Sequence, residues 1–287
     1  MARLTDKQYW NDFWAPPESG LPSAPGILKA ALRRSVGEKS LAFFTQSYAQ
    51  HQIFEGIYRP RVPDHCDATV LEIGSAPGNY LLEMHRKFGM VPFGVDYSHI
   101  GVACNRELFT HNHLDARNVL EADAFAISFQ EAHRGRFDVV MSLGVIEHFT
   151  GAELDSVIDA HINLIKPGGR LIVTIPNYQG LNYLLKLVFC RDNLAAHNLS
   201  IMRLDAFSRI FSGRGLRALF CGYAGTIDLS MATPAPGSRL KALYRIFDKS
   251  QVLLNGILRL SLRKKGFNLP WVSPFLVFVG VKGEKYA

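Results

Sequence analysis

Short apolar runs alternate with amphipathic segments through the middle of the chain. Residues 70–73, 90–95 and 137–142 are apolar runs of strand length. Between them lie segments with apolar residues at helical spacing, of which 81–88 is the clearest. Continuous apolar runs are typical of strands covered by helices on both faces, as in parallel sheets. Residues 68–177 are therefore predicted to form a doubly wound α/β core.

The flanking segments differ from this core in pattern. Residues 1–67 open on an aromatic run from Tyr9 to Trp14, followed by a stretch rich in Pro and Gly. We interpret this part as an N-terminal helical lid segment, and residues 178–287 as a part that completes the sheet and caps the site. The elements expected in the flanks are helices at 27–36, 38–58, 181–190 and 204–213, a break at 191–193, and strands at 216–223 and 275–281.

Composition places the chain among ordinary globular proteins. Hydrophobic residues make up 48% of its 287 residues and charged residues 20%, which is compatible with a sizeable core. Its four cysteines lack a Cys-x-x-Cys spacing, so we expect reduced thiols. The first residues lack the apolar centre of a signal peptide, and no apolar run reaches the ~18 residues of a membrane span. A cytoplasmic protein is expected.

Positive charge is concentrated in one segment, residues 238–265. It holds eight Lys and Arg against a single acid, Asp248, and so accounts for the net charge of +7 of the whole chain. A basic surface for nucleic acid is not indicated. The segment also contains many Leu and Ile residues, which leaves two hypotheses open. It is a surface helix with its apolar face on the core, or a helical element that contacts an anionic membrane. Gly256 would favour two shorter helices.

The segment from Val70 to Tyr80 carries the most specific chemistry. An apolar strand ends in Glu72 and is followed by a turn containing Gly74 and Gly78 and then by a helix. This arrangement presents backbone N–H groups to a nucleotide-like ligand, and the glycines allow the turn and a close approach. Asp96 ends the next strand, 22 residues after Gly74, where a carboxylate can accept hydrogen bonds from both ribose hydroxyls.

Three further motifs follow in register. Asp123 ends a short strand, where it can accept from an adenine amino group, and Phe125 can cover the ring. The strand at 137–142 opens into the loop 143–149 at its carboxyl end, where open α/β sheets bind ligands. The sequence Lys-Pro-Gly-Gly at 166–169 is expected to stop a helix before a strand at 170–175.

Together these motifs resemble those of the class I S-adenosylmethionine-dependent methyltransferases, over about residues 68–177. The motif Ile-Glu-His-Phe at 146–149 is similar to the corresponding motif of the branch that methylates quinones, small metabolites, lipids and sugars. Ala76 and Pro77 depart from the usual Gly-x-Gly-x-Gly loop. The resemblance implies a Rossmann-like, mostly parallel seven-stranded sheet with an insertion between its last two strands, one of them antiparallel.

It also implies S-adenosylmethionine as cofactor and S-adenosylhomocysteine as product. The residues expected at the cofactor are Glu72, Gly74, Ser75, Ala76, Gly78, Asp96, Tyr97, Asp123, Ala124, Ser142 and Leu143. A nicotinamide dehydrogenase is the competing interpretation of the loop. It requires glycines where this chain has Ala76 and Asn79, and it has no standard use for Asp123.

Methyl transfer from a sulfonium needs a base only when the acceptor must lose a proton. His148, after the fourth strand, is the candidate base, although it could instead cap the loop. Glu147 could orient it or bind an ion with it, but a Glu-His dipeptide alone is weak evidence and no metal is expected. Tyr178, and with it Asn177, should face the acceptor pocket, and Tyr178 is a second candidate catalytic residue. His197 and Asn198 are further candidates for acceptor contacts.

The predicted function is methyl transfer to a small-molecule or lipid- or glycan-linked acceptor, with oxygen as the favoured atom. N- or C-methylation, and a non-catalytic module that only binds the cofactor, remain alternatives. The N-terminal aromatic residues Trp10, Phe13 and Trp14 either close the site or attach the N-terminus to the core. The acceptor's identity and the oligomeric state are not specified by the sequence.

Overall fold

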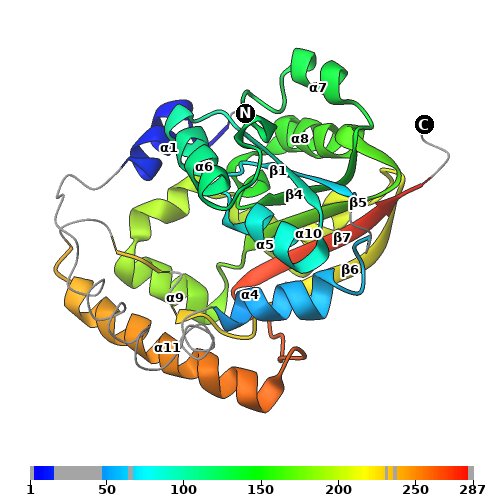
Figure 1. Ribbon diagram of the computed structural model, residues 1–287. Helices are drawn as coiled ribbons and strands as arrows, with labels where there is room; N and C mark the ends of the chain where they lie inside the picture. The colour runs from blue at the N-terminus through cyan, green and yellow to red at the C-terminus, as the bar shows by residue number, and fades with distance from the viewer. Residues whose placement is uncertain (1–2, 16–46, 64–66, 230–231, 235–237, 284–287) are drawn as a thin grey trace.

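The structure, a computed structural model, describes residues 3–15, 47–63, 67–229, 232–234 and 238–283 and is built around one seven-stranded sheet (Figure 1). The strand order is β3-β2-β1-β4-β5-β7-β6, with β7 antiparallel to both of its neighbours. The mostly parallel, doubly wound sheet predicted from the sequence is confirmed. The strands are β1 (Thr69–Ile73), β2 (Val91–Asp96), β3 (Val119–Glu121), β4 (Phe137–Leu143), β5 (Ile165–Pro176), β6 (Leu216–Ala224) and β7 (Phe275–Lys282).

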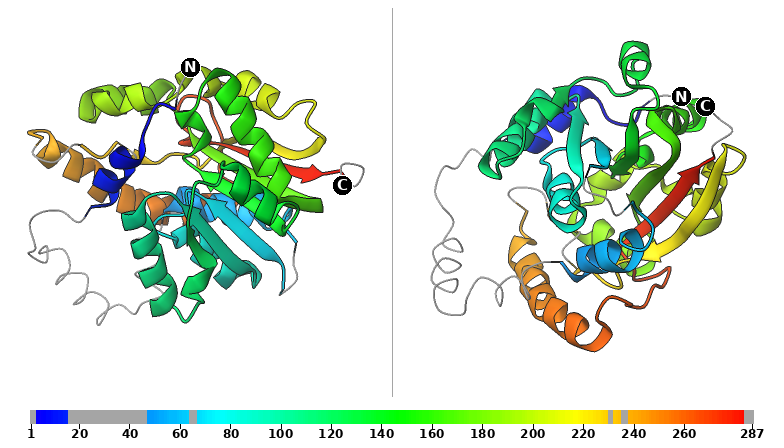
Figure 2. Two further views of the ribbon diagram at one scale, coloured as in Figure 1. Left: turned by 90° about the horizontal axis from the view of Figure 1, so that it is seen from above. Right: turned by 45° about the vertical axis from the view of Figure 1, so that its right-hand side comes forward.

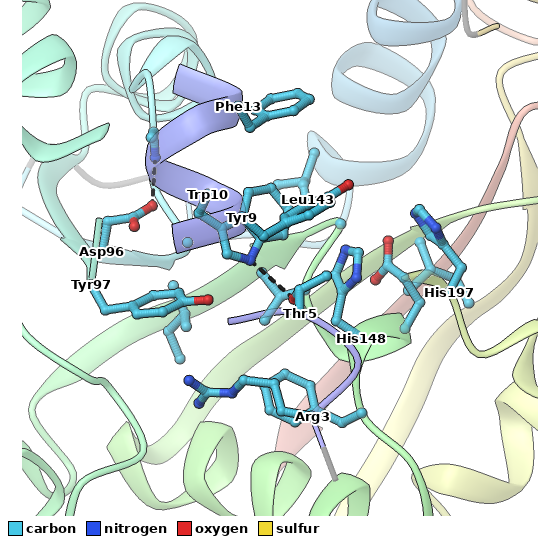
Figure 3. A pocket seen from close by; sticks show the side chains of 18 of the residues that line it. Arg3, Thr5, Tyr9, Trp10, Phe13, Asp96, Tyr97, Leu143, His148 and His197 are labelled. Carbon is cyan, nitrogen blue, oxygen red and sulfur yellow. Dashed lines mark hydrogen bonds between the residues drawn. The ribbon is translucent and has the colours of Figure 1, made fainter. Parts of the chain in front are cut away.

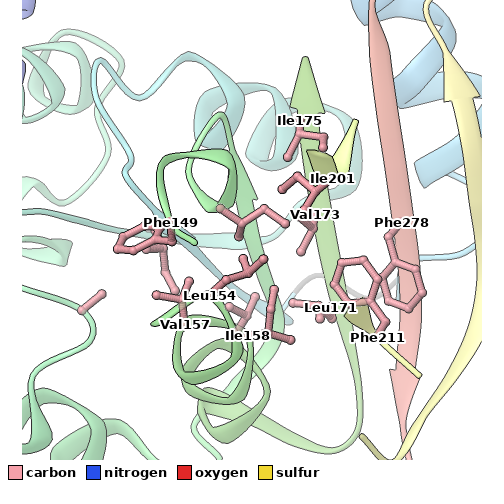
Figure 4. Close-up of a cluster of buried hydrophobic side chains, with 14 of the residues drawn as sticks. Phe149, Leu154, Val157, Ile158, Leu171, Val173, Ile175, Ile201, Phe211 and Phe278 are labelled. Atoms are coloured by element: carbon pink, nitrogen blue, oxygen red, sulfur yellow. The ribbon is translucent and has the colours of Figure 1, made fainter. Parts of the chain in front are cut away.

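Helices cover both faces of the sheet (Figure 2). Alternate residues of one strand serve the two faces: Leu171 and Val173 of β5 belong to one hydrophobic cluster, and Ile172 belongs to the other. Figure 4 shows the first cluster, in which Leu154 and Ile158 lie between the helix and β5. This face is covered by α7 (Ile127–His133), α8 (Gly151–Leu164) and α10 (Leu204–Ile210), and the other by α5 (Asn79–Phe88), α6 (His99–His111) and the π-helical turn η1 (Ile53–Tyr58).

The strand order reverses at β1, which pairs with β2 on one side and with β4 on the other. The chain leaves β1 and β4 at the same edge of the sheet and turns to opposite faces. Such a switch point opens a crevice outside the carboxyl ends of the strands, where doubly wound proteins bind their ligands. The topology therefore places the segments after β1, β2 and β4 around a common space.

Two predicted boundaries were wrong. Lys166 to Gly169 do not separate helix from strand, because β5 already starts at Ile165, and its pairing with β4 shifts register between Phe137 and Val139. Gly168 takes a φ of 76° inside this irregularity. The basic segment forms one helix, α11 (Lys241–Leu262), rather than two. Gly256 is buried in its middle, and the neighbouring Asn255 accepts a hydrogen bond from the Tyr48 backbone N–H (3.0 Å).

The remaining elements lie around the sheet. As predicted, α11 is inserted between β6 and β7, and α9 ends before residue 191. The predicted helix at 27–36 and the first part of that at 38–58 lie outside the described residues, as does Cys66. Cys104, Cys190 and Cys221 are free thiols. The further elements are α1 (Lys7–Trp14), α4 (Tyr48–Gln52), α9 (Gly180–Phe189) and the short helices η2 (Ala116–Asn118), η3 (Ile146–His148), η4 (Arg191–Ala196) and η5 (Leu199–Ile201).

Candidate active site

A pocket of about 400 Å³ opens at the carboxyl ends of the parallel strands. Gly74 follows β1, Asp96 ends β2, and Leu143 ends β4, and all three lie on its wall. Figure 3 shows Asp96 on one side of the space and His148 on the other. The sheet therefore brings the candidate cofactor residues and the candidate base to one site.

The loop after β1 contributes backbone to the wall at Gly74 and Ala76. Gly74 has a φ of 69°, and a Cβ there would lie 2.7 Å from Cγ2 of Val145, so glycine is required by both conformation and space. Gly78 also has a positive φ, but it lies behind the wall. A Cβ at Gly78 would collide with the Asn105 carboxamide, so this glycine permits close packing on α6 rather than ligand approach.

Ser75 and Glu72 support this loop from behind. Asn105 donates to the Ser75 hydroxyl (2.8 Å) and backbone carbonyl (3.2 Å) and holds the loop against α6. Glu72 is 3% exposed, and its Oε2 has no hydrogen-bond partner among the described residues. Burial, and secondarily the Asp96 charge, raises the Glu72 pKa well above its usual value.

Asp96 places a carboxylate at the end of β2. It is 7% exposed, and its two oxygens accept from the backbone N–H groups of Ser98 (2.9 Å) and Ala76 (3.3 Å). Burial raises its pKa, while these N–H groups act in the opposite direction. Each oxygen keeps capacity for a second donor, so Asp96 can accept hydroxyl groups of a ligand while it holds the loop. Tyr97 follows it on the wall and donates to the Asp6 carbonyl (3.1 Å).

The pocket continues past β3 and β4. Asp123 and Ala124 line it, and Asp123 forms an ion pair with Arg3 (3.5 Å). Asp123 also accepts from the Phe125 backbone N–H (2.9 Å), and the Phe125 ring packs on Phe149. These residues give one end of the pocket an apolar wall with acidic groups at its rim.

Ser142 lies behind this wall rather than on it. It is fully buried, and its hydroxyl lies 3.0 Å from Nε2 of His161 on α8. Leu143, the next residue, faces the pocket, because successive side chains of a strand point to opposite faces.

His148 stands at the opposite end of the pocket, in the short helix η3. Its Nδ1 lies 2.7 Å from the Ala196 carbonyl, which places the proton on Nδ1 and leaves Nε2 as an acceptor. Burial lowers the pKa of His148 to about 4, although the Ala196 and Gly144 carbonyls favour the charged form. The ring is therefore neutral at pH 7 and is able to accept a proton.

Glu147 and His197 join His148 in one buried cluster. Each residue offers one possible ligand atom, a ring nitrogen or a carboxylate oxygen. The three atoms lie within 4.8 Å of one another, a spacing that could hold a metal ion. Burial lowers the pKa of His197 to about 3 and raises that of Glu147 to about 8. Oε2 of Glu147 is buried without a hydrogen-bond partner among the described residues. That the site works without a metal stays a prediction.

Tyr178 and Lys186 complete this end of the pocket. The Tyr178 ring packs edge-on against His197, with ring centres 5.0 Å apart, and the Lys186 Nζ lies 4.9 Å from the Tyr178 ring centre. Asn177, predicted to face the pocket, does not. It donates to the carbonyls of Pro270 and Ser273 instead. Asn198 does not line the pocket either, and its side-chain amide donates to the Phe149 carbonyl.

The N-terminal helix α1 closes the pocket from above. Trp10 packs edge-on against His148 (5.1 Å between ring centres), and its Nε1 donates to Thr5 (3.1 Å). The Tyr9 hydroxyl accepts from Asn193 on the far side (3.4 Å). Figure 3 shows Tyr9 and Trp10 reaching over the space between Asp96 and His148. The aromatic run at the start of the chain therefore lines the site.

The comparisons with known proteins are consistent with this architecture. A family described as "Methyltransferase domain" matches residues 45–219. Among curated proteins, a ubiquinone biosynthesis O-methyltransferase of Thiobacillus denitrificans is 30% identical over 119 residues, which cover 42% of this chain and 49% of that protein. The chain therefore matches about half the length of this relative.

Solved structures share the fold at low identity. The [4+2]-cyclase SpnF matches with a TM-score of 0.53 at 14% identity, covering 81% of this chain and 80% of SpnF. A phosphoethanolamine N-methyltransferase 2 of Haemonchus contortus, solved with S-adenosylhomocysteine, matches with a TM-score of 0.51 at 17% identity, covering 91% of this chain and 60% of that one. A geranyl diphosphate C-methyltransferase of Streptomyces coelicolor matches with a TM-score of 0.50 at 14% identity, covering 82% and 76%.

Proposed function

The chain belongs to the methyltransferase-domain family, and on this premise we propose that it transfers a methyl group from S-adenosylmethionine to an oxygen atom of a small-molecule or lipid- or glycan-linked acceptor. The observation that carries the proposal is the neutral His148 imidazole at the end of the pocket opposite Asp96. A hydroxyl acceptor must lose a proton during methyl transfer, and an imidazole suits that task.

The pocket fits the cofactor. Asp96 offers buried acceptors for ribose hydroxyls, and Asp123 offers one for an adenine amino group. Phe125 and Leu143 provide apolar surface for a base. Gly74 lines the wall where a Cβ would meet Val145. When bound, S-adenosylmethionine supplies an activated methyl group on a sulfonium, so the protein mainly has to position the reactants and exclude water.

In this proposal each residue has a defined task. His148 takes the acceptor's proton on Nε2, because Nδ1 is held by the Ala196 carbonyl. Those same carbonyl contacts favour the imidazolium that forms. Tyr178 shapes the pocket beside His197 and can donate a hydrogen bond to the acceptor oxygen. Tyr9 and Trp10 cover the site and keep water out.

N- or C-methylation is the first alternative, since neither requires the same base. A module that binds the cofactor without catalysis is the second. One experiment separates all of them. The protein is incubated with metabolite extract and S-adenosylmethionine labelled in the methyl group, and products are identified by mass spectrometry. We expect formation of S-adenosylhomocysteine and a labelled methyl ether or ester. Label on nitrogen or carbon would overturn O-methylation, and no labelled product would favour the binding module.

A second element of the proposal concerns α11, which we propose rests on an anionic lipid surface. Three polar residues of this helix at four-residue spacing, Gln251, Asn255 and Arg259, are buried against the body of the protein. Gln251 accepts from the Leu229 backbone N–H (2.8 Å), and Arg259 donates to the Ser47 carbonyl (3.2 Å). One polar stripe of the helix is therefore turned inward.

Apolar side chains of α11 face outward instead. Ile246 and Leu253 are each 62% exposed, and Leu260 is 71% exposed. Tyr244 and Phe247 do pack on Phe189 of α9, so only part of the apolar surface is covered. Exposed cations, among them Arg263, Lys264 and Lys265, follow the helix. An exposed apolar stripe beside cations suits the headgroup region of an anionic membrane. None of the described helices is long and apolar enough to cross a bilayer.

A further inference from the structure

A lysine ammonium is buried at the acceptor end of the pocket. Lys186 of α9 is 8% exposed and lines the pocket with Tyr178, Asn193 and His197. In the part of the chain that the structure describes, no carboxylate oxygen pairs with its Nζ within 4.0 Å. Removing an ammonium from water is costly unless an opposite charge compensates it, so this position requires an explanation.

The groups around the Lys186 Nζ are all neutral. Asn193 Oδ1 accepts from it at 3.0 Å, and the Tyr178 ring lies beneath it at 4.9 Å. The Cys190 thiol is a third, weak partner. These contacts orient the ammonium over the ring without neutralising its charge.

The described residues offer the Lys186 ammonium no ion-pair partner at this end of the pocket, because no carboxylate oxygen lies within 4.0 Å of its Nζ. Burial lowers the pKa of Lys186, as expected for a cation without a counter-charge. An anion that enters the pocket there would supply the missing negative charge and would accept a strong hydrogen bond from the Lys186 ammonium.

We propose that Lys186 binds an anionic group of the methyl acceptor, a carboxylate or a phosphate, and thereby selects acidic acceptors. This inference rests on the proposed function, because it assumes that the pocket beside His148 receives the acceptor. The aromatic side chains of Tyr9, Trp10 and Tyr178 line the same space, so an acceptor with an apolar or aromatic body and one acidic group matches the site best.

The test uses three probes of similar shape: benzoate, phenyl phosphate and the uncharged benzamide. Each is titrated by calorimetry into the complete protein saturated with S-adenosylhomocysteine. We expect one or both anions to bind about ten- to a hundred-fold more tightly than benzamide, as for a hydrogen bond between charged groups. The tighter anion identifies carboxylate or phosphate as the group that the site accepts.

Matched variants assign the preference to Lys186. Lys186→Met should bind the anions no better than benzamide, Lys186→Arg should keep a preference for anions, and Lys249→Met, at an exposed position of α11, should match the wild type. Lys186→Gln replaces Lys186→Met if the latter does not fold. Equal binding of all three probes, no binding of any probe, or an anion preference that survives in Lys186→Met would overturn the proposal. Loss of S-adenosylhomocysteine binding, measured separately, would instead count against the proposed function.

Discussion

Asp96 is the residue whose removal tests the cofactor site most directly. Asp96→Ala deletes both carboxylate oxygens that we propose to accept from the ribose hydroxyls, at a position only 7% exposed. Ligand hydroxyls left unpaired there should cost about 1.5–3 kcal/mol, or roughly ten- to a hundred-fold in affinity for S-adenosylmethionine by calorimetry. Asp96→Asn is the comparison, since it keeps one acceptor oxygen and therefore at most one of the two backbone contacts of the loop. Unchanged affinity in a folded Asp96→Ala protein would remove Asp96 from the cofactor site.

His148 is the second residue with a specific prediction. His148→Ala should lower turnover by ~10²–10⁴ while cofactor affinity stays near normal. His148→Asn can still donate to the Ala196 carbonyl, because its amide nitrogen lies near the position of Nδ1, but it cannot take a proton, so it should lose as much activity as His148→Ala. Because the base must be unprotonated, its pKa of about 4 predicts that kcat/KM loses this contribution only as the pH falls to about 4. Turnover near that of the wild type in either variant would make His148 a structural residue.

For single residues, the sequence was informative where a side chain lies at the carboxyl end of a strand or in the loop that follows it. Asp96, Asp123 and His148 could be predicted, because parallel strands bring their carboxyl ends to one edge. Lys186 and Asn193 were missed, since they come from a helix and a loop whose packing no local pattern specifies. Asn177 was misassigned because its position after β5 does not reveal that the 270–273 loop competes for its amide.

Among the elements, the junction of β4 and α8 yields a prediction about stability. His161 is fully buried, with Nδ1 at 2.7 Å from the Val157 carbonyl and Nε2 at 3.0 Å from the Ser142 hydroxyl. Burial lowers its pKa to about 4, whereas an unfolded histidine has a pKa near ~6.5. Between these values the unfolded chain binds the additional proton, so stability is lost as the pH falls.

His161→Gln replaces the imidazole with a side chain that does not titrate, so this pH dependence of the stability should be lost. The wild type should be the more stable protein at pH 7. Its advantage in the free energy of unfolding should shrink by up to about 1.4 kcal/mol per pH unit from about pH 6.5 towards pH 4. Urea denaturation at several pH values gives the free energy of unfolding of both proteins. The other buried histidines titrate in both, so their effects cancel in the difference. Parallel curves for wild type and variant would show that His161 does not titrate as described.

The helix α11 yields a prediction about lipid binding. Two triple variants test it. In the first, Arg263, Lys264 and Lys265 are replaced by Gln. In the second, Ile246, Leu253 and Leu260 are replaced by Ser. Both should reduce sedimentation with anionic vesicles, the first by about a hundred-fold in affinity, because each of the three cations contributes roughly 1 kcal/mol. Binding should also weaken with salt. Replacing Arg117, Arg203 and Arg209, which lie elsewhere, should have no effect. A wild type that stays in the supernatant at low salt would rule out the lipid surface.

The elements show where periodicity is a reliable guide. Buried strands and amphipathic α5 were predicted closely, because apolar residues there all serve one core. In α11 the same pattern was ambiguous, since its apolar residues are divided between α9 and the exterior. Which face of a helix is covered depends on the polar partners that the body offers, here Ser47 and the Tyr48 and Leu229 backbone groups.

For the whole molecule, the site depends on segments far apart in the chain. Helix α1, the loop after β4 and the α9–η4 region meet only because one sheet holds them. The fold class and the cofactor end were predictable, since they lie in one continuous region with ordered motifs. The end of the pocket around His148 was predictable only in part. His148, Tyr178 and His197 line it as expected, whereas contacts such as Tyr9 with Asn193 join residues 184 positions apart. Packing of this kind is a property of the folded state that no short sequence window contains.

The placement of β7 also bears on how the protein is made. It is the last strand to leave the ribosome, yet it lies between β5 and β6 and pairs with both. Until Phe275 emerges, β5 has an open edge and β6 has no partner, while the apolar residues of α11 are already synthesised. Unpaired edges and exposed apolar surface are the features that promote aggregation of nascent chains. A premature stop before β7 should therefore yield an insoluble product that depends on chaperones, even though every cofactor-binding residue proposed above would be present.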